Sequence, residues 1–321
     1  MTASQTQHQE ATAVLDSLGL TAVDGGGRSR SPSNSLPVVA RNEDGRCFLL
    51  KYYLPPRDDS VLPSGVTADD YIWRETGFYR VLDRVDPGRR DLPAPRTIAI
   101  GPGQPPSWIL LQHLAPAVGP REEVLGQDHV VELLDKLAAM STDHLLGRRG
   151  FPFAHWDPAA YLEQVRTMYD ALLFVLGESR WRKVQSFFAE ALRWTEGRRR
   201  VLVHGDFLEE NILVDAEGRP FLVDFENVGI GNEDHDMAWF WIHSDRHPEW
   251  KRQLMRRWLG RHVGGDRIRT EWGLRTAISY LALRRLRWSY LTHGDEDPRQ
   301  SRNLALLDAA LDGGSSLFPR D

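Results

Sequence analysis

The pattern of hydrophobic and polar positions changes along the chain. In the first third, residues 46–53 form an apolar run after an Asp44-Gly45 turn, and Val38 and Val39 precede that turn. This arrangement predicts a β-hairpin. From about residue 115 onward, apolar positions recur at helical spacing. The strongest helical pattern covers 130–140, and further ones cover 158–176, 180–196, 248–260, 270–292 and 299–312. The pattern therefore predicts an α+β fold in which a small, mostly β part precedes a larger helical part.

Three short apolar runs between residues 201 and 223 interrupt the helical pattern and predict strands. The tetrapeptide 215–218 has the composition of a hairpin turn between the second and third of them. We expect the polar residues at the strand ends to lie close together in space. The runs are 201–203, 212–214 and 221–223, and the polar residues near their ends are His204, Asp206, Asn211 and Asp224.

These polar residues suit phosphoryl transfer, which needs a carboxylate to orient an attacking hydroxyl and oxygen ligands to hold magnesium. Taken singly, a His-Gly-Asp tripeptide also fits a turn, and an Asp at a strand end also fits a helix N-cap. The spacing favours the chemical interpretation. An Asp-x-x-x-x-Asn sequence, followed by strand, turn, strand and Asp-Phe, has the order of a kinase catalytic loop and metal loop.

The segments HGDFLEEN and VDFE resemble the aminoglycoside phosphotransferase and choline kinase family, which has a protein-kinase-like fold. The resemblance implies a two-lobed α+β fold, with a small β-rich N-lobe and a larger helical C-lobe. It implies that Asp206 is the catalytic carboxylate and that Asn211 and Asp224 are ligands of Mg²⁺. By the same resemblance His204 supports the loop, and Asp236, in the segment 231–239, begins a helix that braces it. As plain sequence, Asp236 also fits a helix N-cap.

A kinase also needs a lysine that binds the phosphates and a glutamate that pairs with it. Lys51 lies near the end of the apolar strand 46–53, where a buried ammonium group requires a partner. Glu75 lies beside the apolar face of a helix predicted over 69–82, where the family's paired glutamate would be. Lys51 alone also fits a surface position at a strand edge. Together with Glu75 and the downstream loop, it predicts an ion pair.

Two further segments have the positions of nucleotide contacts. The Gly- and Ser-rich stretch 24–35 precedes the first hairpin strand, and Ser33 and Asn34 resemble the Ser-Asn pair at the tip of the family's phosphate loop. This stretch fits a flexible linker equally well. The segment 108–114 predicts a strand followed by a hinge, with Gln112, His113 and Leu114 as expected contacts of adenine.

Length and composition limit the class of protein. A chain of 321 residues with 41% hydrophobic residues divides naturally into two lobes, for which we expect the bounds 21–112 and 113–321 after a tail or added helix over 1–20. The single cysteine, Cys47, and the polar first twenty residues predict a cytoplasmic protein. The net charge of −5 argues against a nucleic-acid partner, and no apolar run predicts a membrane span. We expect a monomer or homodimer.

The acceptor is less well defined by the sequence. We expect ATP, with GTP as an alternative, to donate a phosphoryl group to a small hydroxylated molecule. An aminoglycoside-like or other hydroxylated antibiotic is the first candidate acceptor, and choline, homoserine or a sugar are the alternatives. A cleft of acids and tryptophans would suit a cationic or sugar-like acceptor, although such tryptophans also fit the core and such acids the surface. The acids are Glu209, Glu210, Glu226, Glu233, Asp234 and Asp245, and the tryptophans are Trp239, Trp241, Trp250, Trp258, Trp272 and Trp288.

Two other classes of protein compete with this interpretation. A catalytically silent nucleotide-binding protein of the same fold is disfavoured, because Lys51, Glu75, Asp206, Asn211 and Asp224 are all present. A protein kinase is disfavoured because no Ala-Pro-Glu sequence follows the metal loop. Only 12 residues lead from Asp224 to Asp236, too few for an activation segment.

Overall fold

The computed structural model describes residues 3–23, 35–54, 67–140, 142, 153–294, 297–313 and 317. The described chain divides into two compact units. The first falls within Met1–Pro120, Asp143–Pro152 and Ile212–Asn227, and the second within Arg121–Thr142, Phe153–Asn211 and Val228–Asp321.

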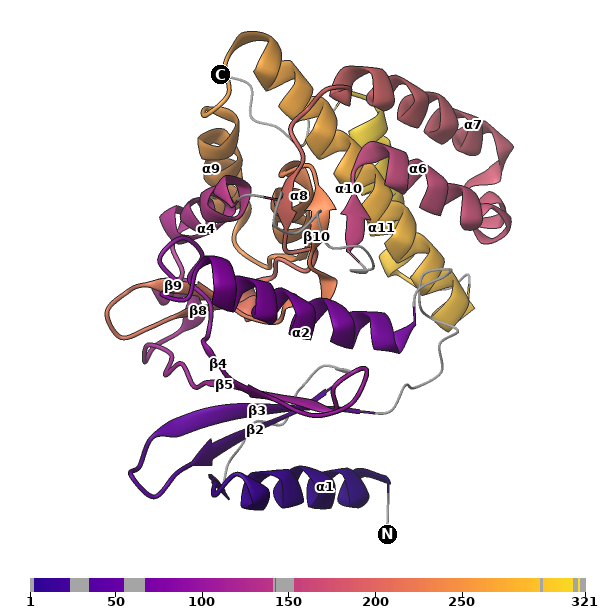
Figure 1. Cartoon of the computed structure of the whole chain (residues 1–321). Coiled ribbons are helices and arrows are strands. Elements are labelled where there is room, and N and C mark those ends of the chain that lie inside the picture. The colour runs from indigo at the N-terminus through magenta and orange to yellow at the C-terminus, as the bar shows by residue number, and fades with distance from the viewer. Residues whose placement is uncertain are drawn as a thin grey trace. The chain divides into compact units, whose positions relative to one another are not determined.

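The first unit is built on a five-stranded antiparallel sheet of order β1-β2-β3-β5-β4. Helices α1 (Ala3–Ser17) and α2 (Ala68–Val85) lie on opposite faces of this sheet (Figure 1). The residues for which the sequence left a choice between a tail and an added helix thus form α1. The strands are β1 (Thr21–Ala22), β2 (Ser35–Arg41), β3 (Cys47–Tyr53), β4 (Thr97–Ile100) and β5 (Trp108–Gln112).

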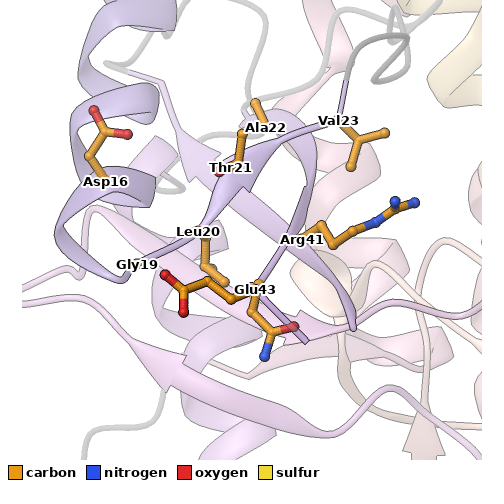
Figure 2. Close-up of a pocket in the computed structure, with 9 residues that line it drawn as sticks. Asp16, Gly19, Leu20, Thr21, Ala22, Val23, Arg41 and Glu43 are labelled. Atoms are coloured by element: carbon orange, nitrogen blue, oxygen red, sulfur yellow. The ribbon is translucent and has the colours of Figure 1, made fainter. Parts of the chain in front are cut away.

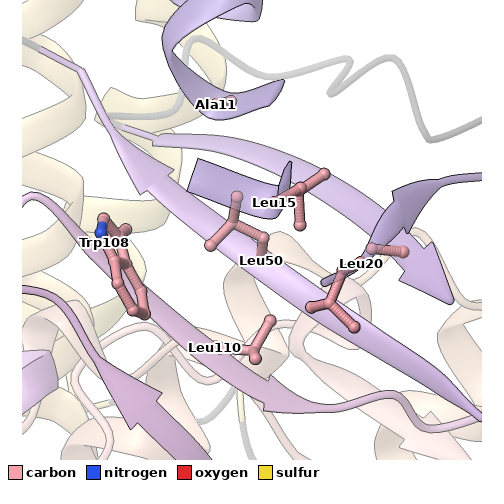
Figure 3. Packing of buried hydrophobic residues seen from close by; sticks show 7 residues of the cluster. Ala11, Leu15, Leu20, Leu50, Trp108 and Leu110 are labelled. Carbon is pink, nitrogen blue, oxygen red and sulfur yellow. The ribbon is translucent and has the colours of Figure 1, made fainter. Parts of the chain in front are cut away.

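Apolar side chains hold α1 against the sheet. Leu15 of α1 and Leu20 pack with Leu50, Trp108 and Leu110 of the central strands, and all five are buried (Figure 3). Because side chains alternate between the faces of a strand, Leu50 points toward α1 and the next residue of β3 points toward the opposite face. The α1 contact therefore fixes which side chains of β3 face α2.

A second hairpin belongs to the first unit although it comes from far along the sequence. Strands β8 (Ile212–Val214) and β9 (Pro220–Leu222) pair antiparallel, and the backbone of Leu222 donates to Pro93 O at 2.9 Å. The following turn η3 (Phe225–Asn227) packs on α2, where the Phe225 ring lies 4.7 Å from Phe78 and 5.6 Å from Tyr79. This packing brings the end of β9 to the same face as Lys51.

The second unit is mostly helical, around a small sheet of order β6-β10-β7. The long helix α10 packs against α7, α8 and α11. The strands are β6 (Ala154–Trp156), β7 (Val201–Val203) and β10 (Gly229–Gly231). The helical elements are α3 (Arg121–Val124), α4 (Gln127–Ala139), α6 (Pro158–Thr167), α7 (Tyr169–Thr195), η2 (Glu209–Asn211), α8 (Asp234–His243), α9 (Pro248–Leu259), α10 (Gly264–His293) and α11 (Arg299–Leu311).

The predicted α+β class is confirmed, with a sheet-rich N-terminal part and a larger helical C-terminal part. Local boundaries differ from the prediction. The pattern over 158–176 is divided at Met168, and α7 continues past 176 with a kink at Gly177, whose φ is 70°. Strand β6 has no counterpart among the predicted strands, because it depends on pairing with β10, more than 70 residues away. Among the described residues, no helix has the length and apolar character needed to cross a bilayer.

Candidate functional site

In the first unit, Lys51 links two carboxylates. Its Nζ atom lies 2.7 Å from Oε2 of Glu75 and 2.6 Å from Oδ1 of Asp224. Lys51 faces α2 because its neighbour Leu50 faces α1, and Glu75 is presented by the buried side of α2. The ion pair expected from the sequence is therefore present, and Lys51 also contacts the expected metal ligand directly.

Burial sets the electrostatics of this cluster. The Glu75 side chain is 1% exposed, and Tyr53 donates a hydrogen bond of 2.8 Å to its Oε2 atom. Burial raises the pKa of Glu75, against the lowering effect of Lys51. Burial alone would lower the pKa of Lys51, but the charges of Asp224, Glu75 and Glu226 outweigh it and hold that pKa well above its usual value. Lys51 is thus a fixed positive charge that Glu75 keeps in position.

Asp224 follows β9 in a backbone conformation that is rare for a residue with a side chain. Its φ is +68°, in the left-handed region that Asp tolerates better than most residues. Its side chain remains 32% exposed while one oxygen contacts Lys51. The backbone at Asp224 therefore turns away from the direction of β9. A carboxylate oxygen of Asp224 remains accessible, as a metal ligand requires.

In the second unit, His204, Gly205 and Asp206 form a loop at the end of β7. Gly205 has a φ of +78°, a conformation that favours glycine and explains the Gly of the His-Gly-Asp sequence. The carboxylate of Asp236 accepts the backbone N–H groups of His204 at 2.7 Å and Gly205 at 2.9 Å. His204 is fully buried, and its Nδ1 accepts the Asp206 N–H at 3.3 Å. Asp236 and His204 thus hold the backbone on both sides of Asp206.

The N-cap interpretation of Asp236 is wrong, because Asp236 is the third residue of α8 and Glu233 occupies the cap position. Its side chain instead reaches back to the loop. Burial raises the pKa of Asp236 to about 7, against the lowering effect of its two backbone hydrogen bonds and with a further increase from the charge of Asp206.

Asn211 ends the loop that carries Asp206 and contacts Asp206 directly. Its Nδ2 atom donates to Asp206 O at 2.8 Å and to Asp206 Oδ2 at 3.0 Å. Both amide hydrogens are thereby directed at Asp206, and the side-chain carbonyl oxygen points elsewhere. An amide oxygen fixed in this way is a suitable ligand for Mg²⁺.

The sequence did not reveal two supports of these clusters. Tyr53, which bonds Glu75, was assigned only to the strand. Arg246 contacts the loop that carries Asp206: its Nε donates to Oε2 of Glu209 at 3.0 Å, and its other nitrogens donate to backbone carbonyls of Arg121, Glu122 and Leu125. Glu209 also accepts a hydrogen bond of 2.5 Å from Ser244. Only the Arg-rich composition hinted at this network, whose partners are far apart in sequence.

The expected nucleotide contacts are partly described. Gln112 ends β5 and its N–H donates to Arg96 O at 2.8 Å. His113 and Leu114 follow as half-buried residues outside any strand, and their backbone groups bond to no other described residue. A hinge requires such available backbone groups. Ser33 and Asn34 lie outside the described residues.

Two pockets lie away from all these residues. One, of about 600 Å³, is formed where α1 meets β1 and β2, and its lining includes Asp16, Leu20 and Arg41 (Figure 2). The other, of about 500 Å³, lies beside the end of α7 and is lined by Asp157, Arg198 and Asn232 among others. Neither contains a residue that the sequence assigned to the site.

Known proteins resemble this chain in sequence and in fold. The sequence profile of the phosphotransferase enzyme family matches residues 31–272. A search of curated proteins found no match. Aminoglycoside phosphotransferase APH(4)-Ia has a similar structure, with a TM-score of 0.62 and 17% identity over 98% of this chain and 100% of that chain.

Two other solved structures have the same fold. A choline/ethanolamine kinase family protein from Mesorhizobium loti gives a TM-score of 0.56 at 17% identity, over 96% of this chain and 98% of that chain. Macrolide 2'-phosphotransferase MphH from Brachybacterium faecium gives a TM-score of 0.58 at 15% identity, over 98% of this chain and 99% of that chain. At these identities the likeness establishes the fold, and the resemblance found in the sequence is confirmed. Because the family profile covers about three quarters of the sequence, this chain belongs to the phosphotransferase enzyme family.

Proposed function

We propose that the protein is an ATP-dependent O-phosphotransferase that moves the γ-phosphoryl group to a hydroxyl of a small polar molecule. The observation that carries this proposal is Lys51, held between Glu75 and Asp224 on the buried face of the sheet. A purely structural lysine would not need two carboxylates, whereas a lysine that binds phosphates must be kept charged and in place.

The first unit supplies the nucleotide contacts in this proposal. Lys51 binds the phosphates, and the available backbone groups of His113 and Leu114 bind the purine, with Gln112 beside them. ATP is the proposed donor and GTP the alternative. Solved relatives of this fold are described as complexes with ADP or AMP-PNP, which supports nucleotide binding here. We assign the nucleotide-binding lobe to 21–112 and the catalytic and acceptor lobe to 113–321, with the hinge at their boundary.

The donor set fits Mg²⁺. Asp224 offers an exposed carboxylate oxygen and Asn211 an amide oxygen, both hard ligands, and Mg²⁺ is commonly held by one or two protein ligands together with phosphates and water. Within the described chain no cluster of three His, Cys, Asp or Glu residues could hold a metal by itself, which is consistent with a metal that arrives with the nucleotide. When bound there, the ion would neutralise charge on the phosphates.

Asp206 is the proposed catalytic residue. Its carboxylate orients the acceptor hydroxyl and accepts its proton as the hydroxyl oxygen forms a bond to the γ-phosphorus. The bond from that phosphorus to the β,γ-bridging oxygen breaks, and the nucleoside diphosphate leaves with the bonding pair. Asn211 holds the Asp206 carboxylate in position, and Asp236 fixes the backbone of the loop. Orientation and proton transfer together supply the rate.

Two classes of acceptor remain for this chemistry. One is an aminoglycoside-like or other hydroxylated antibiotic, whose phosphorylation would confer resistance, and a relative of this fold is described with hygromycin B. The other is a small metabolite such as choline, homoserine or a sugar. The predicted acid-rich cleft gives little support to the first class, because Glu209 pairs with Arg246, and Glu233 and Asp234 pair with Arg198.

The proposal is tested by nucleotide consumption in the presence of Mg²⁺ against hydroxylated antibiotics, amino alcohols and sugars. We expect one class to be phosphorylated, and Asp206→Asn to abolish turnover while nucleotide binding survives. A variant that keeps activity within about tenfold of the original would remove Asp206 from the mechanism. Nucleotide binding without turnover on any acceptor would favour the catalytically silent alternative.

A further inference from the structure

A group of cations in the second unit has few counter-charges among the residues that the structure describes. Its members are Lys251 of α9, Arg284 and Arg285 of α10, and Arg302 of α11. None has an ion-pair partner within the described chain. Arg302 is exposed, and the other three are half-buried. Among the described residues, one neighbouring acid without an ion pair, Asp245, opposes them, so the described cations outnumber their free counter-charges.

The charges of this cationic cluster act on one another. Burial, followed by the charge of Arg302, lowers the pKa of Lys251. Burial and then Arg302 and Arg299 likewise lower the pKa of Arg285. Arg299 itself is bonded to Asp297 and is not part of the cluster. Like charges held half-buried are unfavourable unless an anion offsets them.

Two tryptophans beside these cations carry further hydrogen-bond donors. The Nζ atom of Lys251 lies 4.9 Å from the ring centre of Trp241, and the guanidinium of Arg284 lies 5.5 Å from that of Trp239. The indole Nε1 atoms of both tryptophans are buried and have no hydrogen-bond partner among the described residues. A buried donor without a partner is unfavourable. His243, stacked on Trp239 at 4.6 Å, stays neutral, because burial lowers its pKa to about 4.

The cationic cluster is connected to the catalytic loop by direct contacts. Glu209, in the turn before Asn211, accepts a hydrogen bond from Ser244, and Lys251 donates to Ser244 O at 3.0 Å. Trp239 also follows Asp236 by three residues on α8, so both lie on one side of that helix. The cluster is thus within two residue contacts of the loop that carries Asp206.

We propose that the cationic cluster binds an anionic group, a carboxylate or a phosphate, of the acceptor. This inference rests on the proposed phosphotransferase function and narrows its substrate to hydroxylated molecules that carry a negative charge. Polycationic aminoglycosides fit such a site poorly, because their ammonium groups would be brought against Lys251 and Arg285. The unpaired donors and the excess positive charge both point to the same kind of ligand.

The test compares three forms of one acceptor scaffold: the neutral alcohol, its carboxylate and its phosphate ester. We expect wild-type protein to prefer a charged form, and the ratio of kcat/KM for the charged over the neutral form to fall about ten- to a hundredfold in Arg285→Gln and in Lys251→Gln. The ratio within one variant does not depend on how much of it is folded. Arg252→Gln, an exposed residue of α9 bonded to Glu249, is the matched control and should keep the ratio.

A second measurement does not require turnover. For each protein, the Tm is measured in sodium sulfate and in sodium chloride of equal ionic strength. The increase in Tm from chloride to sulfate should be larger for the wild-type protein than for Lys251→Gln/Arg285→Gln. The general salting effect of sulfate acts on both proteins and cancels in the difference. Equal shifts would overturn the proposal. Turnover confined to neutral or cationic acceptors would overturn it while leaving the phosphotransferase function intact. Loss of the function itself would appear as no Asp206-dependent nucleotide consumption with any acceptor.

Discussion

Replacing Lys51 by methionine tests whether the ion pair is as buried and as necessary as its geometry indicates. The change removes the only charge that lies within 2.7 Å of Glu75 in the described chain, and Glu75 is 1% exposed with one oxygen that already has no hydrogen-bond partner. Removing one partner of a buried ion pair typically costs about 3–5 kcal/mol. We expect Lys51→Met to lose this much free energy of unfolding at pH 8.

The loss should depend on pH in a defined direction. Without Lys51, nothing offsets the effect of burial on Glu75, so its folded-state pKa rises further above the value in the unfolded chain. A carboxyl group whose pKa is raised by folding stabilises the folded state at pH values below its unfolded-state pKa. That stabilisation is lost as the pH rises through its folded-state pKa. The difference between wild type and Lys51→Met should therefore be smaller at pH 5 than at pH 8.

A double variant separates stability from function. Lys51→Met/Glu75→Gln removes both charges, and glutamine can still accept the hydrogen bond of Tyr53, so most of the lost stability should return. Asp224 also loses its partner, but it is 32% exposed and remains solvated. Phosphotransfer should not return. Urea unfolding of wild type, both single variants and the double variant measures the coupling. A Lys51→Met protein that unfolds at the wild-type urea concentration at pH 8 would refute the buried ion pair.

Three further variants address other parts of the site. Asp224→Ala should lose the Mg²⁺-dependent part of nucleotide affinity, so its titrations with and without Mg²⁺ should coincide; a wild-type response to Mg²⁺ would make Asp224 only a strand end. Asp236→Asn places an amide donor against a backbone N–H and should lower kcat. Because burial raises the Asp236 pKa to about 7, wild type should lose stability between about pH 4 and 7 relative to this variant, and parallel urea midpoints across that range would contradict the assignment. Arg246→Met leaves Glu209 without its cation and should cost about 3 kcal/mol in urea unfolding, whereas an unchanged midpoint would show that the network is dispensable.

Local features of the site could be predicted from the sequence. Asp206 and Asn211 are five residues apart in one loop, so their spacing alone brings the amide to the carboxylate. The side of the sheet on which Lys51 lies follows from strand alternation, since Leu50 belongs to the apolar cluster under α1. Glu75 on the buried side of α2 follows from helical periodicity. In each case the position of the side chain follows from the spacing of residues only a few positions apart in the sequence.

Long-range pairings could not be predicted in this way. The contact between Arg246 and Glu209 joins residues 37 apart, and nothing in either local pattern specifies the other. Glu209 was expected to add negative charge to an acceptor cleft, but its charge is offset by Arg246. Strand β6 and the continuation of α7 through Gly177 likewise depend on packing with distant segments, which overrides local propensity.

The net charge of an acceptor site is therefore set by the charged side chains that have no ion-pair partner, and not by the amino-acid composition of the region. The second unit contains acids close to its tryptophans, yet the structure places Arg198 against Glu233 and Asp234, and Arg246 against Glu209. Each of these pairs removes an acid from the set that can attract a ligand. Lys251 and Arg285 have no such partners within the described chain, so positive charge remains. A net negative chain can thus present a positive site, and the sign of that site follows from counting ion pairs in the folded protein.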